Sequence, residues 1–185
     1  MTALINQVVH RLLPNNAFAR SVGVLVGGTA GSQLLLVLAS PLLTRLYSPE
    51  DFGLLAVYMG LLSLFSVIAS LRYELAIPLP ESDQDAANVA LLSLLCVIGT
   101  TLFTTLMVIF AGEQIAMALD IPRLVNYFWL LPLGVLLLGT YQLFKYWAIR
   151  AKKFPTIAKT RLVQVLTTLS IQLLGYKLGG AALLV

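Results

Sequence analysis

The chain has 185 residues, of which 59% are hydrophobic and only 11% are charged, and its mean hydropathy is +0.91. An ordinary soluble domain carries about 25% charged residues, because a solvated surface needs ionic groups. A chain this poor in charge must face lipid over most of its surface, which excludes a soluble globular domain. The net charge of +4 is too small and too dispersed for a nucleic-acid-binding surface.

Residues 1–20 differ in kind from the rest of the chain. Their apolar and polar side chains recur at helical spacing on opposite sides. This pattern predicts a short amphipathic helix that lies on the cytoplasmic membrane surface and ends near Pro14. The apolar side consists of Leu4, Ile5, Val8, Val9, Leu12 and Leu13.

Long uncharged stretches follow, separated by short charged segments. A bilayer core about 30 Å thick requires about 20 helical residues, whereas strands of a membrane β-barrel would alternate in polarity over about ten residues. These stretches are continuously apolar, so we predict an all-α, polytopic transmembrane bundle with five complete spans and a truncated sixth. The spans are expected at residues 21–46, 52–77, 86–111, 124–149, 157–177 and, incompletely, 178–185.

The basic residues predict the orientation of the bundle, because Lys and Arg accumulate on the cytoplasmic side of membrane proteins. If the N-terminus is cytoplasmic, nine of the 12 basic residues fall inside, and Arg45, Arg123 and Lys177 fall outside. The segment between the fourth and fifth spans contributes most of this excess. We therefore predict a multi-pass protein with a cytoplasmic N-terminus.

The sequence shows no metal-ligand cluster and no catalytic constellation. Its one histidine, His10, has no cysteine or carboxylate neighbour at ligand spacing. Its one cysteine, Cys96, lies within an apolar run and cannot form a disulfide within the chain. No phosphate-binding, dinucleotide-binding or nucleophile-elbow motif occurs. We expect no enzymatic activity, no metal and no cofactor.

The first expected span contains polar and small residues that a simple anchor does not need. Gln33 lies near mid-membrane, where a polar side chain is costly and usually faces a cavity or a partner. Gly27 and Gly31 form a G-x-x-x-G pair, which indicates close helix packing and requires no function. Pro41 is expected to kink the helix. A long, bent helix with polar positions is more typical of a transporter than of an anchor.

The fifth expected span carries a row of polar residues. Arg161, Gln164, Thr168 and Gln172 are three or four positions apart and are expected to share one face of the helix. Such a row points either to a water-filled cavity or to polar contacts between helices. We favour the cavity.

Two arginines end the first two spans on opposite sides of the membrane. Arg45 and Arg72 either snorkel to the interface or line a path for an anion. Arg72 is also placed to form an ion pair with Glu74. The acidic segment 81–85 is interpreted as a solvated hairpin. No Asp or Glu lies well inside any span, which argues against an acidic proton or sodium relay in these helices.

Three segments carry a family resemblance. Residues 40–53 read S-P-L-L-T-R-L-Y-S-P-E-D-F-G, residues 71–80 read L-R-Y-E-L-A-I-P-L-P, and S-D-Q-D-A at residues 82–86 opens the third span. They resemble the bacterial polysaccharide biosynthesis proteins, the Wzx-type O-antigen and exopolysaccharide flippases. These proteins belong to the multidrug/oligosaccharidyl-lipid/polysaccharide (MOP) exporter superfamily. The resemblance covers nearly the whole chain from about residue 21.

The resemblance implies a MATE/MOP-like fold and an origin in the N-terminal lobe of a larger two-lobed transporter. Because alternating access needs both lobes, such a piece is not expected to transport alone. The implied function is an inner-membrane flippase that moves a polyprenyl-diphosphate-linked oligosaccharide from the cytoplasmic to the periplasmic leaflet for surface polysaccharide synthesis. Membrane lipid, the lipid-linked glycan, a polysaccharide polymerase and glycosyltransferases are the expected partners, and nucleic acid is not. Arg45 and Arg72 lie in the matching segments and carry over as diphosphate-binding candidates, since arginine geometry suits a diphosphate.

Two other functions stay open at this point. A multidrug or metabolite/cation antiporter of the same superfamily would be expected to use buried carboxylates, and none is seen in these spans. A non-transporting scaffold subunit would instead pack its polar positions against partner helices. The complete set of expected substrate-binding or cavity residues is Arg45, Arg72, Gln33, Arg161, Gln164, Thr168 and Gln172.

Overall fold

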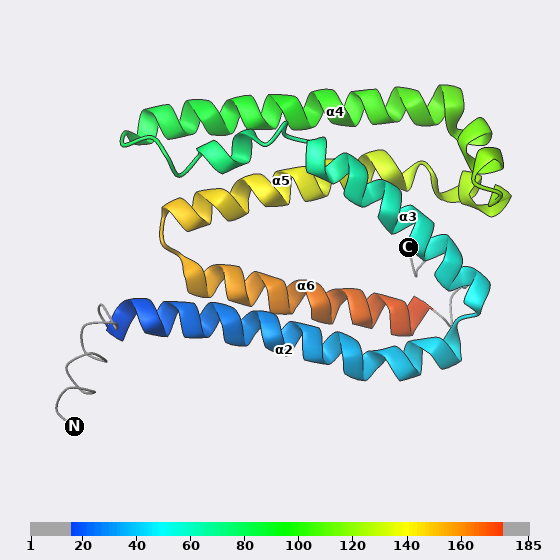
Figure 1. The fold of residues 1–185 in the computed structure, drawn as a ribbon, viewed down its shortest axis with the longest axis horizontal. Coiled ribbons are helices and arrows are strands. Elements are labelled where there is room, and N and C mark those ends of the chain that lie inside the picture. Colours follow the sequence, from blue (N-terminus) through cyan, green and yellow to red (C-terminus); the bar gives the residue numbers. More distant parts are fainter. Residues whose placement is uncertain (1–15, 176–185) are drawn as a thin grey trace, which may run out of the picture.

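The computed structural model describes residues 16–175, and within that range the chain is helical with no β-strand. This confirms the predicted all-α class. Most of the expected interfacial segment 1–20 and the truncated sixth span at 178–185 lie outside the described residues, and residues 16–20 belong to the first described helix. The elements in chain order (Figure 1) are α2 (Asn16–Leu46), α3 (Pro49–Ile68), the 3-10 helix η1 (Tyr73–Ala76), α4 (Asp83–Ala118), the 3-10 helix η2 (Pro122–Tyr127), α5 (Leu130–Arg150) and α6 (Phe154–Gly175).

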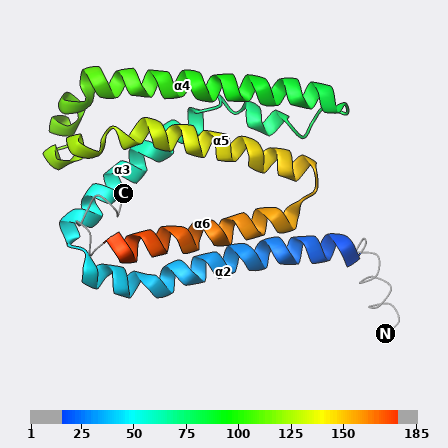
Figure 2. The ribbon, with the colours of Figure 1, turned by 180° about the vertical axis from the view of Figure 1, so that it is seen from behind.

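The long helices form two groups. α2 packs against α6 along most of its length, although these are the first and last helices of the described chain. α4 packs against α5, and α3 crosses beside α5 in the same group. Figures 1 and 2 show that α5 and α6 separate from the turn that joins them. A short turn at Tyr47–Ser48 connects the two groups at their opposite end.

The core of the α3–α4–α5 group consists of apolar side chains at helical spacing, which gives each helix one buried face. Gly139 of α5 lets the helices approach closely. A Cβ at this position would lie 2.8 Å from Cγ1 of Val97 and 3.3 Å from Cβ of Ala69. The buried core residues are Leu54, Tyr58, Leu62, Phe65, Ala69, Val97, Ala116, Leu124, Phe128, Leu131 and Val135.

The α2–α6 contact uses different small residues from those that the sequence indicates. A Cβ at Gly28 would lie 2.9 Å from Cβ of Ala158, and the buried Ser32 hydroxyl donates to the Gly28 carbonyl at 2.7 Å. A Cβ at Gly27 or Gly31 would meet none of the described neighbours within 4 Å. The expected packing role of the Gly27/Gly31 pair is therefore wrong by one position. One residue turns a helix by about 100°. The pair that faces α6 is therefore Gly28 and Ser32, one position further along α2.

The second span ends earlier than expected. α3 stops at Ile68, so the predicted range 52–77 is too long. Leu71 and Arg72 have positive φ angles of 49° and 65°. This left-handed conformation cannot continue a right-handed helix. The chain therefore reverses here and forms η1.

The third span, expected at residues 86–111, lies inside the longer helix α4, whereas the fourth departs from its expected start. α4 has 36 residues, about 54 Å at about 1.5 Å per residue, and so exceeds a bilayer core of about 30 Å. The α-helix of the fourth span begins at Leu130, not at residue 124, because η2 occupies residues 122–127 and buries Leu124 in the core. Pro132 lies in the first turn of α5, where its missing N–H is tolerated.

Three helices within residues 16–175 are long and apolar enough to cross a membrane. They are Val26–Leu46, Pro49–Ile68 and Asp83–Ala118. Many large apolar side chains are exposed on them, which suits contact with lipid. α5 and α6, with 21 and 22 residues, are not among these three helices. The protein is thus a helical membrane protein, and the count of five complete spans stays a prediction.

Candidate functional site

A groove lies between α5 and α6, the two helices that separate from a common turn. It has a volume of about 460 Å³, and its wall is almost entirely apolar. Lys159, in the second turn of α6, is the one basic residue of the lining. The groove can therefore hold a hydrocarbon chain with an anionic group near Lys159. Its residues are Leu137, Leu138 and Tyr141 of α5 and Lys159, Thr160, Val163 and Gln164 of α6.

The polar row expected on the fifth span is divided between two environments in α6. Gln164 and Thr168 are exposed, and Gln164 lines the groove. Arg161 is half-buried. Gln172 is buried, because it lies on the same face as Val165, which packs against α2. The exposed part of the row is therefore the pair Gln164 and Thr168, one turn apart.

Gln172 lies where α6 meets the turn after α2. The Tyr47 hydroxyl donates to the backbone carbonyl of Gln172 at 2.6 Å. Burial raises the pKa of Tyr47, and the nearby Asp51 carboxylate raises it further. The hydroxyl is protonated at neutral pH, as in an ordinary tyrosine, and donates here. This hydrogen bond ties α6 to α2 across 125 positions of the sequence.

The remaining expected site residues are exposed and dispersed. Gln33 and Arg45 lie on α2, and Arg72 lies between α3 and η1. None of the three lines the α5–α6 groove. The structure therefore brings Gln164 to the groove, with Thr168 one turn beyond it, and leaves these three residues on other surfaces.

The expected ion pair between Arg72 and Glu74 is wrong. Glu74 is buried and accepts a hydrogen bond from the Ser70 hydroxyl. Arg72 has a left-handed backbone, and its side chain is exposed. It makes no ion pair with another described residue. Its guanidinium is therefore available to an external anion.

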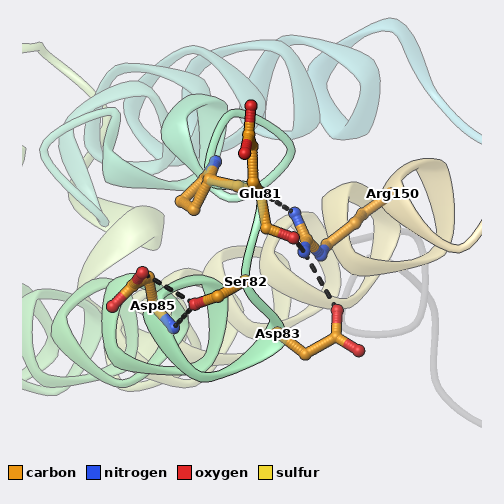
Figure 3. A network of polar contacts seen from close by, with 6 residues as sticks. Glu81, Ser82, Asp83, Asp85 and Arg150 are labelled. Atoms are coloured by element: carbon orange, nitrogen blue, oxygen red, sulfur yellow. Dashed lines mark hydrogen bonds and ion pairs between the residues drawn. The ribbon is translucent and has the colours of Figure 1, made fainter.

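Arg150, at the end of α5, makes contacts that the sequence analysis did not predict. Its guanidinium donates to the backbone carbonyls of Pro80 and Glu81 and pairs with Asp83 at 2.9 Å (Figure 3). The Arg150 side chain is only 15% exposed, whereas that of Asp83 is 94% exposed. The Arg150 guanidinium therefore joins the start of α4 to the end of α5.

The acidic segment 81–85 is part of a helix start and not a solvated hairpin. Ser82 is the N-cap of α4, and its hydroxyl oxygen accepts a hydrogen bond from the Asp85 N–H at 3.0 Å (Figure 3). A serine followed three positions later by an acidic residue is a capping signal that is visible in the sequence. Reading that signal would have placed the helix start correctly, although not the partner of Arg150.

Residues 16–175 contain no group of three or more His, Cys, Asp or Glu side chains that could hold a metal ion. The polar groups at the groove are the amine of Lys159, the hydroxyls of Tyr141 and Thr160 and the amide of Gln164. Such groups can bind phosphate and hydroxyl groups by charge and hydrogen bonding.

Comparison with known proteins identifies the family. A family model described as polysaccharide biosynthesis protein matches residues 42–184, which is more than half of the chain. No curated protein and no solved structure matches. The matched range includes the α5–α6 groove and most of the residues 40–53, together with residues 71–86, on which the sequence resemblance depends. The chain belongs to the polysaccharide biosynthesis protein family.

Proposed function

We propose that this protein acts in a flippase that moves a polyprenyl-diphosphate-linked oligosaccharide from the cytoplasmic to the periplasmic leaflet of the bacterial inner membrane. The observation that carries the proposal is the α5–α6 groove, which combines an apolar wall with Lys159 near one end. An apolar surface suits the polyprenyl chain, and the ammonium group suits the diphosphate. Membership in the polysaccharide biosynthesis family supports the glycan part of the substrate.

The proposed orientation has a cytoplasmic N-terminus. The start of α4, the end of α5 and the start of α6 lie at one end of the molecule (Figure 1). The exposed Lys152 and Lys153 belong to the turn at this end. Basic residues favour the cytoplasmic side, so this end faces the cytoplasm in the proposal. The turn between α2 and α3 and the segment η2 then face the periplasm.

The span-end arginines have a role at the two sides of the membrane. Arg72 lies near the cytoplasmic end of α3 in this orientation, and Arg45 lies near the periplasmic end of α2. Each offers an exposed guanidinium that suits a diphosphate. An inside-negative potential assists export of an anion by about 2.3 kcal/mol per charge per 100 mV. This could contribute to driving export without an acidic relay.

Charge reversal at Arg72 tests the proposed path. In cells that depend on this protein for glycan export, Arg72→Glu is expected to lower export about tenfold, equivalent to about 1.4 kcal/mol, because the new carboxylate repels the diphosphate. The measurement is the amount of surface polysaccharide and of lipid-linked glycan retained on the cytoplasmic leaflet. Arg72→Lys is the matched control, since it keeps a positive charge at the same exposed position and is expected to retain most export.

Two outcomes would contradict these roles. Unchanged export in both Arg72→Glu and Arg45→Glu would remove the arginines from the path. Normal surface polysaccharide after deletion of the gene, in a strain with no redundant transporter, would overturn the flippase proposal itself.

Thiol labelling separates a transport path from a scaffold that packs its polar face against other helices. In a Cys96→Ser background, cysteines at the exposed positions Gln164 and Thr168 are expected to react with a membrane-impermeant maleimide, because the proposed path is filled with water there. A cysteine at Gln172 is the control. It is expected to react at least about tenfold more slowly, because Gln172 is buried against α2. Protection of both Gln164 and Thr168 from reagent on each side would favour the scaffold.

A further inference from the structure

A second pocket lies at the end of the molecule away from Arg150. It is formed by the first turns of α3, the turn after α4, and η2. Its volume of about 710 Å³ falls within the range of about 300–1,000 Å³ that is common for ligand sites. Unlike the α5–α6 groove, its wall is polar and apolar in similar measure. The polar and aromatic residues of the lining are Glu50, Asp51, Asp120, Arg123, Asn126 and Tyr127.

The charges of this pocket exclude an anion as the preferred ligand. Three carboxylates, those of Glu50, Asp51 and Asp120, stand against the one guanidinium of Arg123. Glu50 already pairs with Arg123, with 3.1 Å between Oε2 and Nη1. The carboxylates of Asp51 and Asp120 remain, so the electrostatic potential in the pocket is negative and would repel a phosphate or diphosphate group.

The acidic residues do not form a cation site either. Asp51 accepts from the Ser48 backbone N–H at 3.1 Å as part of the capping box of α3. The described residues, these included, contain no group of three or more carboxylates, histidines or cysteines that could hold a metal ion. What remains is a set of exposed acceptors and donors suited to an uncharged, polar ligand.

The lining matches the two kinds of surface on a sugar ring. The Asn126 amide offers both donors and an acceptor, and the carboxylates add acceptors for hydroxyl groups. The half-buried Tyr127 and the buried Leu54 add apolar surface, and tyrosine combines such a surface with a polar hydroxyl. A pyranose ring presents hydroxyl groups at its rim and C–H groups on its faces, so it can satisfy both parts of the wall.

We propose that this pocket binds the neutral sugar part of the translocated glycan, at the end of the protein where the glycan emerges. This inference rests on the proposed function for the identity of the ligand. The two ends of the molecule then have complementary tasks. The basic end receives the anionic diphosphate, and the acidic pocket receives the uncharged sugar and rejects the diphosphate.

A leucine at Gly53 tests the pocket without disturbing the packing. Gly53 lines the pocket, and a Cβ there would meet no described neighbour within 4 Å, so the side chain can occupy the pocket. Gly60→Leu is the matched control, because Gly60 lies on the same helix with the same free space and does not line the pocket. The probe is the lipid-free, phosphate-free oligosaccharide released by mild acid from the lipid-linked glycan of the same cells.

Binding of the probe to the full chain in nanodiscs is measured by saturation-transfer NMR and by titration calorimetry. We expect Gly53→Leu to weaken binding about tenfold or more and Gly60→Leu to leave it unchanged. Asn126→Ala is a second variant in case Gly53→Leu fails to fold, with an expected loss of about fivefold. Asn88→Ala, at an exposed asparagine of α4, is its control.

The outcomes separate this inference from the proposed function. No binding to the unmodified protein, or equal binding in the unmodified chain and in folded Gly53→Leu or Asn126→Ala, overturns the sugar pocket. If export persists with either of these results, the flippase proposal is retained and the sugar-binding pocket is rejected. If the probe binds as expected while deletion of the gene leaves export intact, the sugar-binding pocket is retained and the flippase proposal is rejected.

Discussion

Arg150→Ala is expected to lower the free energy of unfolding by about 2–3 kcal/mol, because charge-assisted hydrogen bonds at a mostly buried donor are lost. The Arg150 side chain is only 15% exposed, and its guanidinium donates to the backbone carbonyls of Pro80 and Glu81. These carbonyls precede α4 and lose this charged donor in the variant. Unfolding of the purified chain in mixed micelles, followed by circular dichroism as the denaturing detergent increases, measures the change.

Asp83→Ala is the control for the ionic part of the Arg150 contact. Asp83 is 94% exposed, so its pairing with Arg150 is screened by water and contributes about 0–1 kcal/mol. Lys152→Ala, at an exposed residue of the following turn, is expected to change stability by less than about 0.5 kcal/mol. If Asp83→Ala destabilised the protein as much as Arg150→Ala, the backbone contacts would not be the main contribution.

Gly28→Leu is expected to lower stability by about 1–3 kcal/mol and to loosen the α2–α6 pair, because the added side chain has no room. A Cβ at Gly28 already lies 2.9 Å from Cβ of Ala158. The change should appear in unfolding experiments and as faster amide hydrogen exchange in α6. The α3–α4–α5 group should keep its exchange rates, since its own core does not contain Gly28.

Gly27→Leu, one position away, provides the matched control. It adds the same side chain to the same helix, but at a position where a Cβ would meet no described neighbour within 4 Å. We expect a change of about 0.5 kcal/mol or less. Equal effects at Gly27 and Gly28 would mean that the two helices do not pack in the register described above.

The existence of the helices could be predicted from the sequence, whereas several of their limits could not. Long apolar stretches leave the backbone no alternative to internal hydrogen bonds in lipid, which is why the all-α class is confirmed. The end of α3 depends on positive φ angles at Leu71 and Arg72, and neither residue is a glycine that would mark such a turn. The start of α5 depends on tertiary burial of Leu124 and Phe128, which no local pattern reports.

The candidate site shows the same division between local pattern and distant contact. Helical spacing predicted a row from Arg161 to Gln172, and Gln164 and Thr168 within it are exposed in the structure. Gln172 follows the same spacing but is buried, because α2 covers that part of α6. Nothing in the sequence of α6 identifies α2 as its neighbour. The same distant pairing decides that Gly28, and not Gly27, is the close-contact position.

The pairing of α2 with α6 also dictates an order of assembly during synthesis. α3, α4 and α5 can pack against one another as they emerge, since they are consecutive along the chain. The contact face of α2 must wait until the ribosome has added the segment up to α6, a delay on the order of ten seconds at about 5–20 residues per second. During that interval Gly28 and Ser32 remain open to lipid or to other helices nearby. Translation that stops before Phe154 would leave α2 without its partner, even though three later helices are complete.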